Sequence, residues 1–246
     1  MHRGHEGTVY SLDTQWKAGR PPPANARKKR TGKVEPAAGD DEGVITLVSG
    51  SHDQSILVWD VITVPVGKKD ISLQVDQTRK LHSHTADVYA LELLLEPDKR
   101  YGMLVSGGDY TVRSWNIEQG VNIQTLHGHT GYVACLRIRG KRAFSGSWDT
   151  TVRSWNLEAG KGMHVFKGHK NIVNCIDVTD TDIFSGSWDM TVIQWSRATG
   201  EPVNVFHGHT DGVQCLQIHD ELLFSGSMDK SIRVWNPKVN EHIIIF

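Results

Sequence analysis

The sequence predicts an all-β protein built from repeats of one short unit. Tryptophans recur every forty residues, at Trp115, Trp155, Trp195 and Trp235. Between them lie segments of about seven residues rich in β-branched and aromatic types, and no helical period survives in windows of this size. The 246 residues are 38% hydrophobic and include 24 Gly. This composition is typical of a soluble globular protein with many tight turns.

Each repeat carries the same polar residues at fixed positions. An Asp lies six residues before the Trp, Ser residues lie two and four residues before the Asp, and a His lies further upstream. The second repeat departs from this pattern, because it keeps only Ser106 and its His follows Ser83 instead of Gly. An earlier Trp59 brings the number of repeats to five. The five sets are His5, Asp53 and Trp59; His84, Asp109 and Trp115; His129, Asp149 and Trp155; His169, Asp189 and Trp195; His209, Asp229 and Trp235.

Four strands are expected in each repeat, as the third repeat illustrates. They cover Tyr132–Ile138, Arg142–Trp148, Thr151–Leu157 and Gly162–Gly168, separated by Gly, Asp or Asn. Four short strands per forty residues, with a Gly-His and a Trp-Asp-like signature, are typical of a β-propeller blade. The predicted blades span residues 5–83, 84–128, 129–168, 169–208 and 209–246 of one propeller domain, 1–246.

Two segments interrupt the period. Residues 16–43 are rich in Pro, Gly and charge, so we expect a disordered loop insertion in the first blade. Its basic cluster, residues 26–30, is typical of a solvated loop, and a nuclear import signal is the alternative. Residues 66–79 are expected to form a long connection between the third and fourth strands of that blade.

The repeated Gly-His, Ser, Asp and Trp make the chain resemble the WD-repeat family, although only Trp59–Asp60 has the full Trp-Asp dipeptide. The resemblance implies that His, Asp, Trp and one Ser of each repeat form a buried hydrogen-bond chain. Both Ser of a pair lie on the same face of the strand, so either could join. The family usually closes a ring of seven blades, and five are visible here. A fragment of a longer protein is favoured over an arc completed by self-association or a partner, and over a five-bladed ring.

Ser, His and Asp also suggest a hydrolase, and pairs such as His127 and His129 suggest a metal site. Five copies and the lack of a nucleophile elbow disfavour the hydrolase, and no Cys or acid joins the His pairs at zinc-like spacing. No catalytic residue, metal or cofactor is therefore expected, and the protein is not expected to be an enzyme.

The three cysteines, Cys135, Cys175 and Cys215, recur at one repeat position and are interpreted as buried small hydrophobes of an intracellular protein, cytoplasmic or nuclear.

The resemblance also implies a binding face around the central channel. Two of its positions flank the Val that opens each first strand, and the third precedes the Asp of the tight turn. The residues expected to bind a protein or peptide are Tyr10, His52, Asp87, Tyr89, Tyr132, Trp148, Ile172, Trp188, Gln214 and Met228. Aromatic residues and Met are enriched at interface hot spots. Packing of Trp148 and Trp188 on neighbouring blades is the alternative.

The expected function is that of a non-catalytic interaction scaffold. The net charge of −1, the lack of a basic stripe on the face and the lack of a long apolar run disfavour nucleic acid and membrane as partners. The style of the blades resembles propellers beside F-box or RING modules of ubiquitin ligases, where the propeller selects the substrate. A regulatory propeller of a kinase or another multidomain signalling protein is the alternative.

Overall fold

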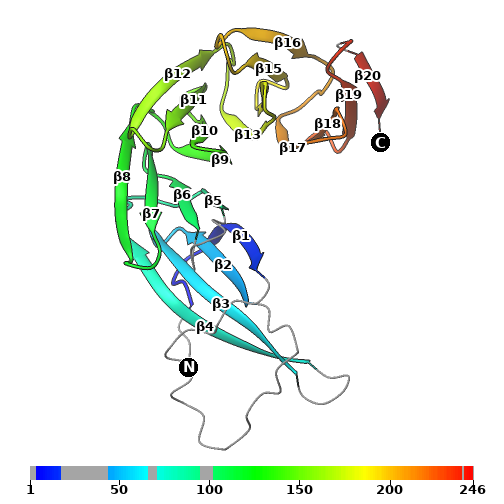
Figure 1. Ribbon diagram of the computed structural model, residues 1–246. Coiled ribbons are helices and arrows are strands. Elements are labelled where there is room, and N and C mark those ends of the chain that lie inside the picture. Colours follow the sequence, from blue (N-terminus) through cyan, green and yellow to red (C-terminus); the bar gives the residue numbers. More distant parts are fainter. Residues whose placement is uncertain (1–3, 18–43, 66–70, 95–101, 240, 246) are drawn as a thin grey trace, which may run out of the picture.

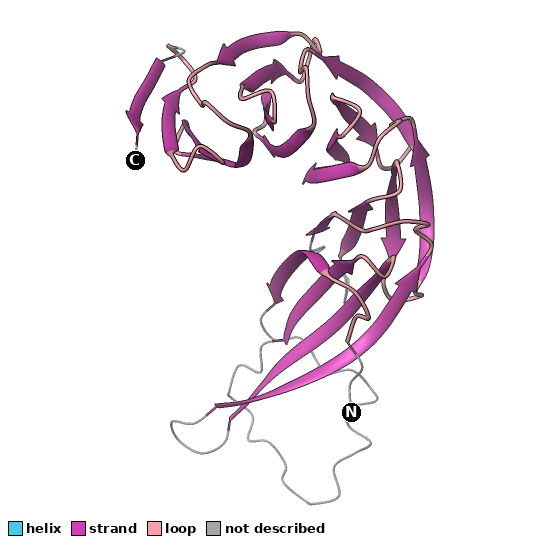
Figure 2. Cartoon of the chain, turned by 180° about the vertical axis from the view of Figure 1, so that it is seen from behind, coloured by secondary structure: helices cyan, strands magenta, loops and turns pink. Residues whose placement is uncertain are grey.

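The computed structural model describes residues 4–17, 44–65, 71–94, 102–239 and 241–245, and these form five four-stranded antiparallel sheets (Figure 1). This confirms the predicted all-β fold of propeller blades. The described residues contain strands and turns but no α-helix, as Figure 2 shows from behind, and hence no helix that is long and apolar enough to cross a membrane.

Each sheet takes four strands that are consecutive in the chain. Blade 1 contains β1 (Val9–Lys17), β2 (Val44–Ser51), β3 (Ser55–Pro65) and β4 (Ile71–His82). Blade 2 contains β5 (Ala90–Leu94), β6 (Met103–Gly107), β7 (Thr111–Asn116) and β8 (Val121–His127). Blade 3 contains β9 (Val133–Arg139), β10 (Arg142–Ser147), β11 (Thr151–Asn156) and β12 (Lys161–Lys167). Blade 4 contains β13 (Val173–Val178), β14 (Asp182–Ser187), β15 (Val192–Ser196) and β16 (Pro202–Phe206). Blade 5 contains β17 (Val213–His219), β18 (Leu222–Ser227), β19 (Ile232–Asn236) and β20 (Glu241–Ile245).

Blade 1 differs from its sequence-based prediction at both insertions. Strand β1 continues to Lys17, so Trp16 and Lys17 belong to this strand and not to the expected loop insertion. Residues 18–43, with the basic cluster 26–30, lie outside the described residues. The expected connection over 66–79 is wrong from Ile71 onward, because Ile71–Arg79 belongs to β4. These residues pair with β3 in an antiparallel ladder from Pro65↔Ile71 onward. The alternation of Ile71, Leu73 and Val75 with polar residues was the available sequence signal for this strand.

The blades stand side by side in an open arc. Successive first strands β1, β5, β9, β13 and β17 contact one another along the inner side of the arc. Blade 5 and blade 1 face each other across the opening and do not meet in either view (Figures 1 and 2). The five blades therefore do not close as a ring of five.

A close backbone contact joins each blade to the next. The Val that precedes or opens a first strand inserts beside a Gly of the preceding blade, and a Cβ on that Gly would lie only 2.5–2.7 Å from the Val Cγ1. The pairs are Gly50 with Val88, Gly107 with Val133, Gly146 with Val173, and Gly186 with Val213. All four of these Val are fully buried. Glycine is required here because no side chain fits between the blades.

Carboxylates on the first strands also connect neighbouring blades. Asp13 accepts the backbone N–H of Leu93 at 2.6 Å, and Glu92 accepts that of Ile138 at 2.6 Å. Asp177 accepts the N–H of Ile218 at 2.8 Å. Burial raises the pKa of Glu92 to about 7, against the opposing effects of Arg137 and the Ile138 N–H. These acids share one position in the repeat, four residues after the Val, which the sequence interpretation did not single out.

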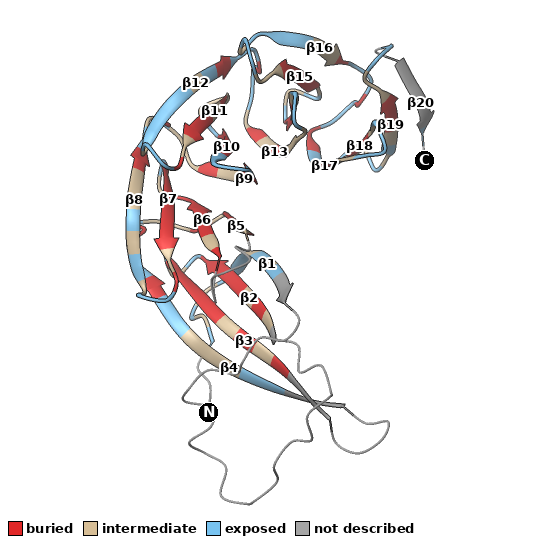
Figure 3. Cartoon of the chain, viewed as in Figure 1, coloured by how far each residue is buried: buried red, intermediate tan, exposed pale blue. Residues whose placement is uncertain are grey.

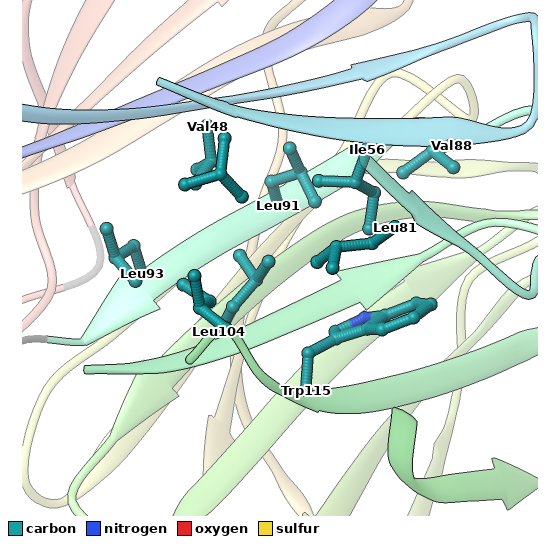
Figure 4. Close-up of a cluster of buried hydrophobic side chains, with 10 residues drawn as sticks. Val48, Ile56, Leu81, Val88, Leu91, Leu93, Leu104 and Trp115 are labelled. Atoms are coloured by element: carbon teal, nitrogen blue, oxygen red, sulfur yellow. The ribbon is translucent and has the colours of Figure 1, made fainter. Parts of the chain in front are cut away.

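The hydrophobic core lies between adjacent blades. One cluster combines Val48, Ile56 and Leu81 of blade 1 with Leu104 and Trp115 of blade 2 (Figure 4). Equivalent clusters follow between blades 2 and 3, 3 and 4, and 4 and 5. Burial is concentrated in the middle strands, whereas the outer strands β8, β12 and β16 expose much of their length (Figure 3). Each blade is consequently stabilised mainly by its neighbours.

Candidate functional site

A chain of four side chains crosses each blade, and blade 3 shows its geometry. His129 Nδ1 lies 2.6 Å from Asp149 Oδ2, and His129 Nε2 lies 2.8 Å from Ser145 Oγ. The indole N–H of Trp155 donates to the same Ser145 Oγ at 2.8 Å. Because an indole N–H can only donate and a carboxylate can only accept, neutral His129 with its proton on Nδ1 satisfies every member. The hydroxyl of Ser145 then donates to His129 Nε2.

The same chain occurs in all five blades. The His–Asp distance runs from 2.6 to 3.0 Å and the His–Ser distance is 2.7 or 2.8 Å. The Trp–Ser distance is 2.8 Å in four blades and 3.3 Å in blade 1. The structure brings together His5, Asp53 and Trp59; His84, Asp109 and Trp115; His129, Asp149 and Trp155; His169, Asp189 and Trp195; and His209, Asp229 and Trp235.

The two serines of each pair have different partners. The first, exemplified by Ser145, joins His and Trp within the blade. The second, Ser147, donates to the carbonyl of Gly131 at 3.1 Å and accepts the N–H of Asp149 at 3.1 Å. Ser187 and Ser227 repeat these two bonds. The second Ser therefore holds the tight turn against the loop that enters the blade.

A hydroxyl two residues after each Asp completes the turn and was missed from sequence. Thr151 Oγ1 donates to Asp149 Oδ1 at 2.6 Å, while the N–H of Thr130 donates to Oδ2 at 2.9 Å. Burial by itself would raise the pKa of Asp149. Hydrogen bonds from His129 and Thr151 outweigh it and hold the pKa well below its usual range. The recurrence of Ser or Thr at this position in every repeat was the available signal.

The order Asp–His–Ser is the connectivity of a hydrolase triad, yet the serine is unsuited to attack a substrate. The side chain of Ser145 is fully buried, and its oxygen already accepts the Trp155 N–H. A nucleophile must reach a substrate atom through solvent or a binding cleft. The chain is instead suited to fix the loops of a thin sheet, because each buried polar group has a partner.

Blade 2 shows why its departures from the repeat are tolerated. Arg113 is buried and donates to Asp109 at 3.0 Å, to Thr111 and to Ser83 Oγ. Ser83 occupies the position where four repeats have Gly. Burial lowers the pKa of His84 despite the opposing charge of Asp109. Arg113 is thus an additional member of the buried network of blade 2.

Five rings from three blades form a continuous surface, which we term the aromatic cluster: Tyr10, Tyr89, Tyr110, Tyr132 and Trp148. Tyr10 and Tyr89 have ring centroids 4.9 Å apart, and Tyr89 and Trp148 are 5.9 Å apart. Tyr132 lies 5.2 Å from Trp148, 5.6 Å from Tyr89 and 5.0 Å from Tyr110. The exposed fractions of Tyr10, Tyr110 and Trp148 are 45%, 46% and 43%.

An acid and a histidine border the aromatic cluster. Asp87 Oδ2 lies 2.8 Å from His52 Nδ1 and accepts the hydroxyl of Tyr89 at 3.1 Å. The ring of His52 also meets Tyr10 edge-on, at 6.5 Å between centroids. Burial and the hydrogen bond to Asp87 raise the pKa of Tyr89 to about 12, so its phenol remains a proton donor at neutral pH. The cluster is thereby held in place by its own hydrogen bonds.

The comparison with known families decides what kind of protein this is. The family described as WD domain, G-beta repeat matches residues 75–116, 120–156, 160–196 and 200–236, which together make up more than half of the chain. The chain belongs to the WD-repeat family. Proteins of this family generally act as non-catalytic scaffolds that bind other proteins.

A curated relative supports the same assignment. An uncharacterized WD repeat-containing protein of Schizosaccharomyces pombe is 34% identical over 62 residues, which are 25% of this chain and 17% of the relative. The chain therefore matches only about a sixth of that protein's length.

Among the described residues, no ring contact joins the remaining residues expected at the WD-repeat binding face to the aromatic cluster. Trp188 is 41% exposed and covers Gly212 of the next blade, so it combines exposure with the neighbour packing that was the alternative. Gln214 accepts a hydrogen bond from Asn174 and thereby links blades 4 and 5. Ile172 is half-buried and Met228 is 53% exposed. Within the described ranges, no ring contact joins Trp188 to Trp148.

Tyr110 was missed by the sequence interpretation. It follows the tight-turn Asp109 and has a φ of 65°, as do its counterparts Gln54, Thr150, Met190 and Lys230 at 65–70°. At this position the side chains of Tyr110 and Met190 are 46% and 45% exposed. The residue after each Asp is thus an additional position of the face, and an aromatic residue there was the signal.

The cysteines differ in exposure although they share one repeat position. Cys175 is buried and Cys135 is half-buried, but Cys215 is exposed, so the expectation of three buried cysteines is wrong for Cys215. Gly226 beside it has no Val of a following blade near it. Burial raises the pKa of Cys135 to about 12, which keeps that thiol protonated. Among the described residues, no group of three or more His, Cys, Asp or Glu could hold a metal ion.

Proposed function

We propose that this WD-repeat chain is a non-catalytic scaffold that binds a protein or peptide partner through the aromatic cluster. The observation that carries the proposal is the unbroken series of ring contacts, 4.9–5.9 Å long, from Tyr10 on blade 1 to Trp148 on blade 3. Three of the five rings are more than 40% exposed. Large rings that are already ordered bind with little loss of conformational entropy, which is why Trp and Tyr dominate interface hot spots.

The location of the rings supports the same proposal. Tyr10 lies at the start of β1, and Tyr89 and Tyr132 directly precede β5 and β9. Tyr110 and Trp148 lie in the turns between second and third strands, so all five rings lie at one end of three blades. The hydrogen-bond chains of the blades fix both kinds of loop, as Asp149 does for Thr130 and Thr151. A surface supported in this way changes little on binding, and most of the contact energy is available for affinity.

The test compares partner capture by the wild-type chain and by variants. Trp148→Ala together with Tyr10→Ala should remove proximity-labelled partners from cells while the melting temperature stays within a few degrees. Ile123→Ala is the matched control, because Ile123 is 56% exposed on the outer strand β8. Unchanged labelling by the double variant, with the fold intact, would show that partners use another surface.

A narrower form of the proposal is substrate selection for a ubiquitin ligase of the F-box or RING type, supported by the blade style noted from the sequence. The same style of the blades supports an alternative, in which the chain is a regulatory propeller associated with a kinase. The labelled partners separate the two: ligase subunits, together with a partner that accumulates when the proteasome is inhibited, favour the first. A labelled kinase whose signal does not depend on the proteasome favours the second.

A further inference from the structure

We propose that the aromatic cluster recognises a cationic side chain, Lys or Arg, on the partner, with Asp87 as the charge that pairs with it. The inference rests on the proposed function and adds the chemical class of the residue that is bound. It is carried by the position of one carboxylate inside a group of rings.

Asp87 is surrounded by donors that are neutral or weakly basic. Its Oδ2 is 2.8 Å from His52 Nδ1 and accepts the Tyr89 hydroxyl at 3.1 Å. Burial by itself would raise the pKa of Asp87, but the hydrogen bonds from His52 and Tyr89 lower it below its usual value. The carboxylate consequently stays charged at neutral pH.

No Lys or Arg of the described residues pairs with this charge. The ion pair that the structure gives Asp87 is with His52, whose side chain is 62% exposed. Other acids of the chain differ in this respect, since Asp109 pairs with Arg113 and Asp180 with Arg139. A carboxylate that is 18% exposed and lacks a permanent cation attracts one from solution more strongly than a fully hydrated carboxylate does.

The rings supply the second part of the site. Tyr89 lies between Tyr10 and Trp148, with centroid distances of 4.9 and 5.9 Å. The faces of Trp and Tyr attract a cation within about 6 Å of the ring centroid. A Lys or Arg side chain combines a charged head with an apolar stem. The head can therefore reach Asp87 while the stem covers Trp148.

Other anchors fit the same surface less well. A phosphate or carboxylate on the partner would be repelled by Asp87. A purely apolar side chain would cover Asp87 and remove water from its carboxylate without supplying a cation in exchange, which costs free energy. The charge of the site thus selects among partners that the rings alone would accept.

The experiment titrates the whole chain with defined peptides. The probes are Ac-Gly-Gly-Lys-Gly-Gly-NH2, its Arg counterpart, its uncharged norleucine counterpart and its Glu counterpart. The indole N–H signal of Trp148, assigned by its loss in Trp148→Ala, is followed by NMR. The Lys and Arg peptides should shift this signal saturably, with dissociation constants about tenfold lower than that of the norleucine peptide. The Glu peptide should leave it unchanged.

Two variants test the role of Asp87. Asp87→Asn should raise the dissociation constant of the Lys peptide about tenfold and bring it to that of the norleucine peptide. Asp220→Asn is the control, because Asp220 is 87% exposed and belongs to a different turn. Lowering the salt concentration should tighten the binding of the Lys peptide to the wild type, and this dependence on salt should be lost in Asp87→Asn.

The outcomes separate this inference from the proposed function. Equal shifts from the norleucine and Lys peptides, or unchanged binding in Asp87→Asn, overturn cation recognition and leave the aromatic cluster as an apolar contact. Partner labelling that survives Trp148→Ala with Tyr10→Ala overturns the proposed function itself. Shifts from none of the peptides, with partner labelling still dependent on the rings, also overturn cation recognition.

Discussion

Trp155 donates its indole N–H to Ser145, whose hydroxyl oxygen lies 2.8 Å away and equally far from His129 Nε2. One buried oxygen thus satisfies the tryptophan of the third strand and the histidine of the loop that enters the blade. The loop that enters the blade is thereby fixed to the third strand through one hydroxyl group.

Ser145→Ala should destabilise the fold by about 1–3 kcal/mol, because it leaves the buried N–H of Trp155 without an acceptor. Thr130→Ala is the control, since Thr130 is exposed and its hydrogen bond to Asp149 uses only the backbone N–H. Denaturation in urea at pH 7 measures both. Equal stabilities of the two variants would contradict the assigned role of Ser145.

Acid should lower the stability of the folded protein by protonating the five aspartates of the tight turns. Hydrogen bonds lower the folded pKa of Asp149 and its four counterparts, against a burial effect that raises them. A lowered carboxyl pKa gives stability that is complete above the unfolded pKa of about 4 and is lost as the pH falls below it. Asp149→Asn should be less stable at pH 7 and should lose less on acidification. Urea denaturation at pH 5, 4 and 3 tests this.

Ionisation of Glu92 should destabilise the protein as the pH rises, which is opposite in sign to the effect of the turn aspartates and occurs at higher pH. The folded pKa of Glu92 is raised from 4.5 to about 7, mainly by burial. The stability that goes with protonated Glu92 is therefore complete below about pH 4.5 and is lost as the pH rises through 7. Glu92→Gln keeps an acceptor for the Ile138 N–H and should stabilise the protein by on the order of 2 kcal/mol at pH 8, but little at pH 4.5. Glu201→Gln, at an exposed site, should change neither value.

Two equivalent glycines should respond differently to alanine. A Cβ at Gly146 would lie 2.6 Å from Val173 of the next blade, whereas at Gly226 the one close atom is the Cys215 Sγ at 2.8 Å. Gly146→Ala should therefore cost about 1–3 kcal/mol through overpacking, and Gly226→Ala clearly less. Adding Val173→Ala should recover part of the loss in Gly146→Ala. Similar melting temperatures for the two single variants would show that blades 3 and 4 can move apart freely.

The sequence predicted the fold because its signals are local and repeated. The spacing of His129, Asp149 and Trp155 is set within one blade, so a forty-residue window contains the whole pattern. The choice of Ser145 over Ser147 depends on which loop each hydroxyl meets, and alternation in a strand carries no such information. The contacts of Glu92 depend on the register between two blades, which lies outside any single repeat.

The aromatic cluster could be predicted only in part. The positions of Tyr10, Tyr89, Tyr132 and Trp148 followed from the resemblance, but Trp188 occupies the equivalent position without joining them. The difference arises because the first-strand residues beside Trp188 are Ile172 and Asn174, and those beside Trp148 are Tyr132 and Ala134. The ring contacts therefore require aromatic residues at facing positions of neighbouring blades.

The Val–Gly contacts between blades make this molecule an array in which each unit is held by its nearest neighbours. Val9 is 45% exposed and Ile232 is 52% exposed, whereas the corresponding Val of the inner blades are fully buried. Opening should accordingly begin as fraying at blades 1 and 5 and progress inward. Amide hydrogen exchange would then be slowest in blade 3, so Trp148 and Tyr132 would belong to the most persistent part of the molecule, whereas Tyr10 of the same aromatic cluster lies on a blade that opens early.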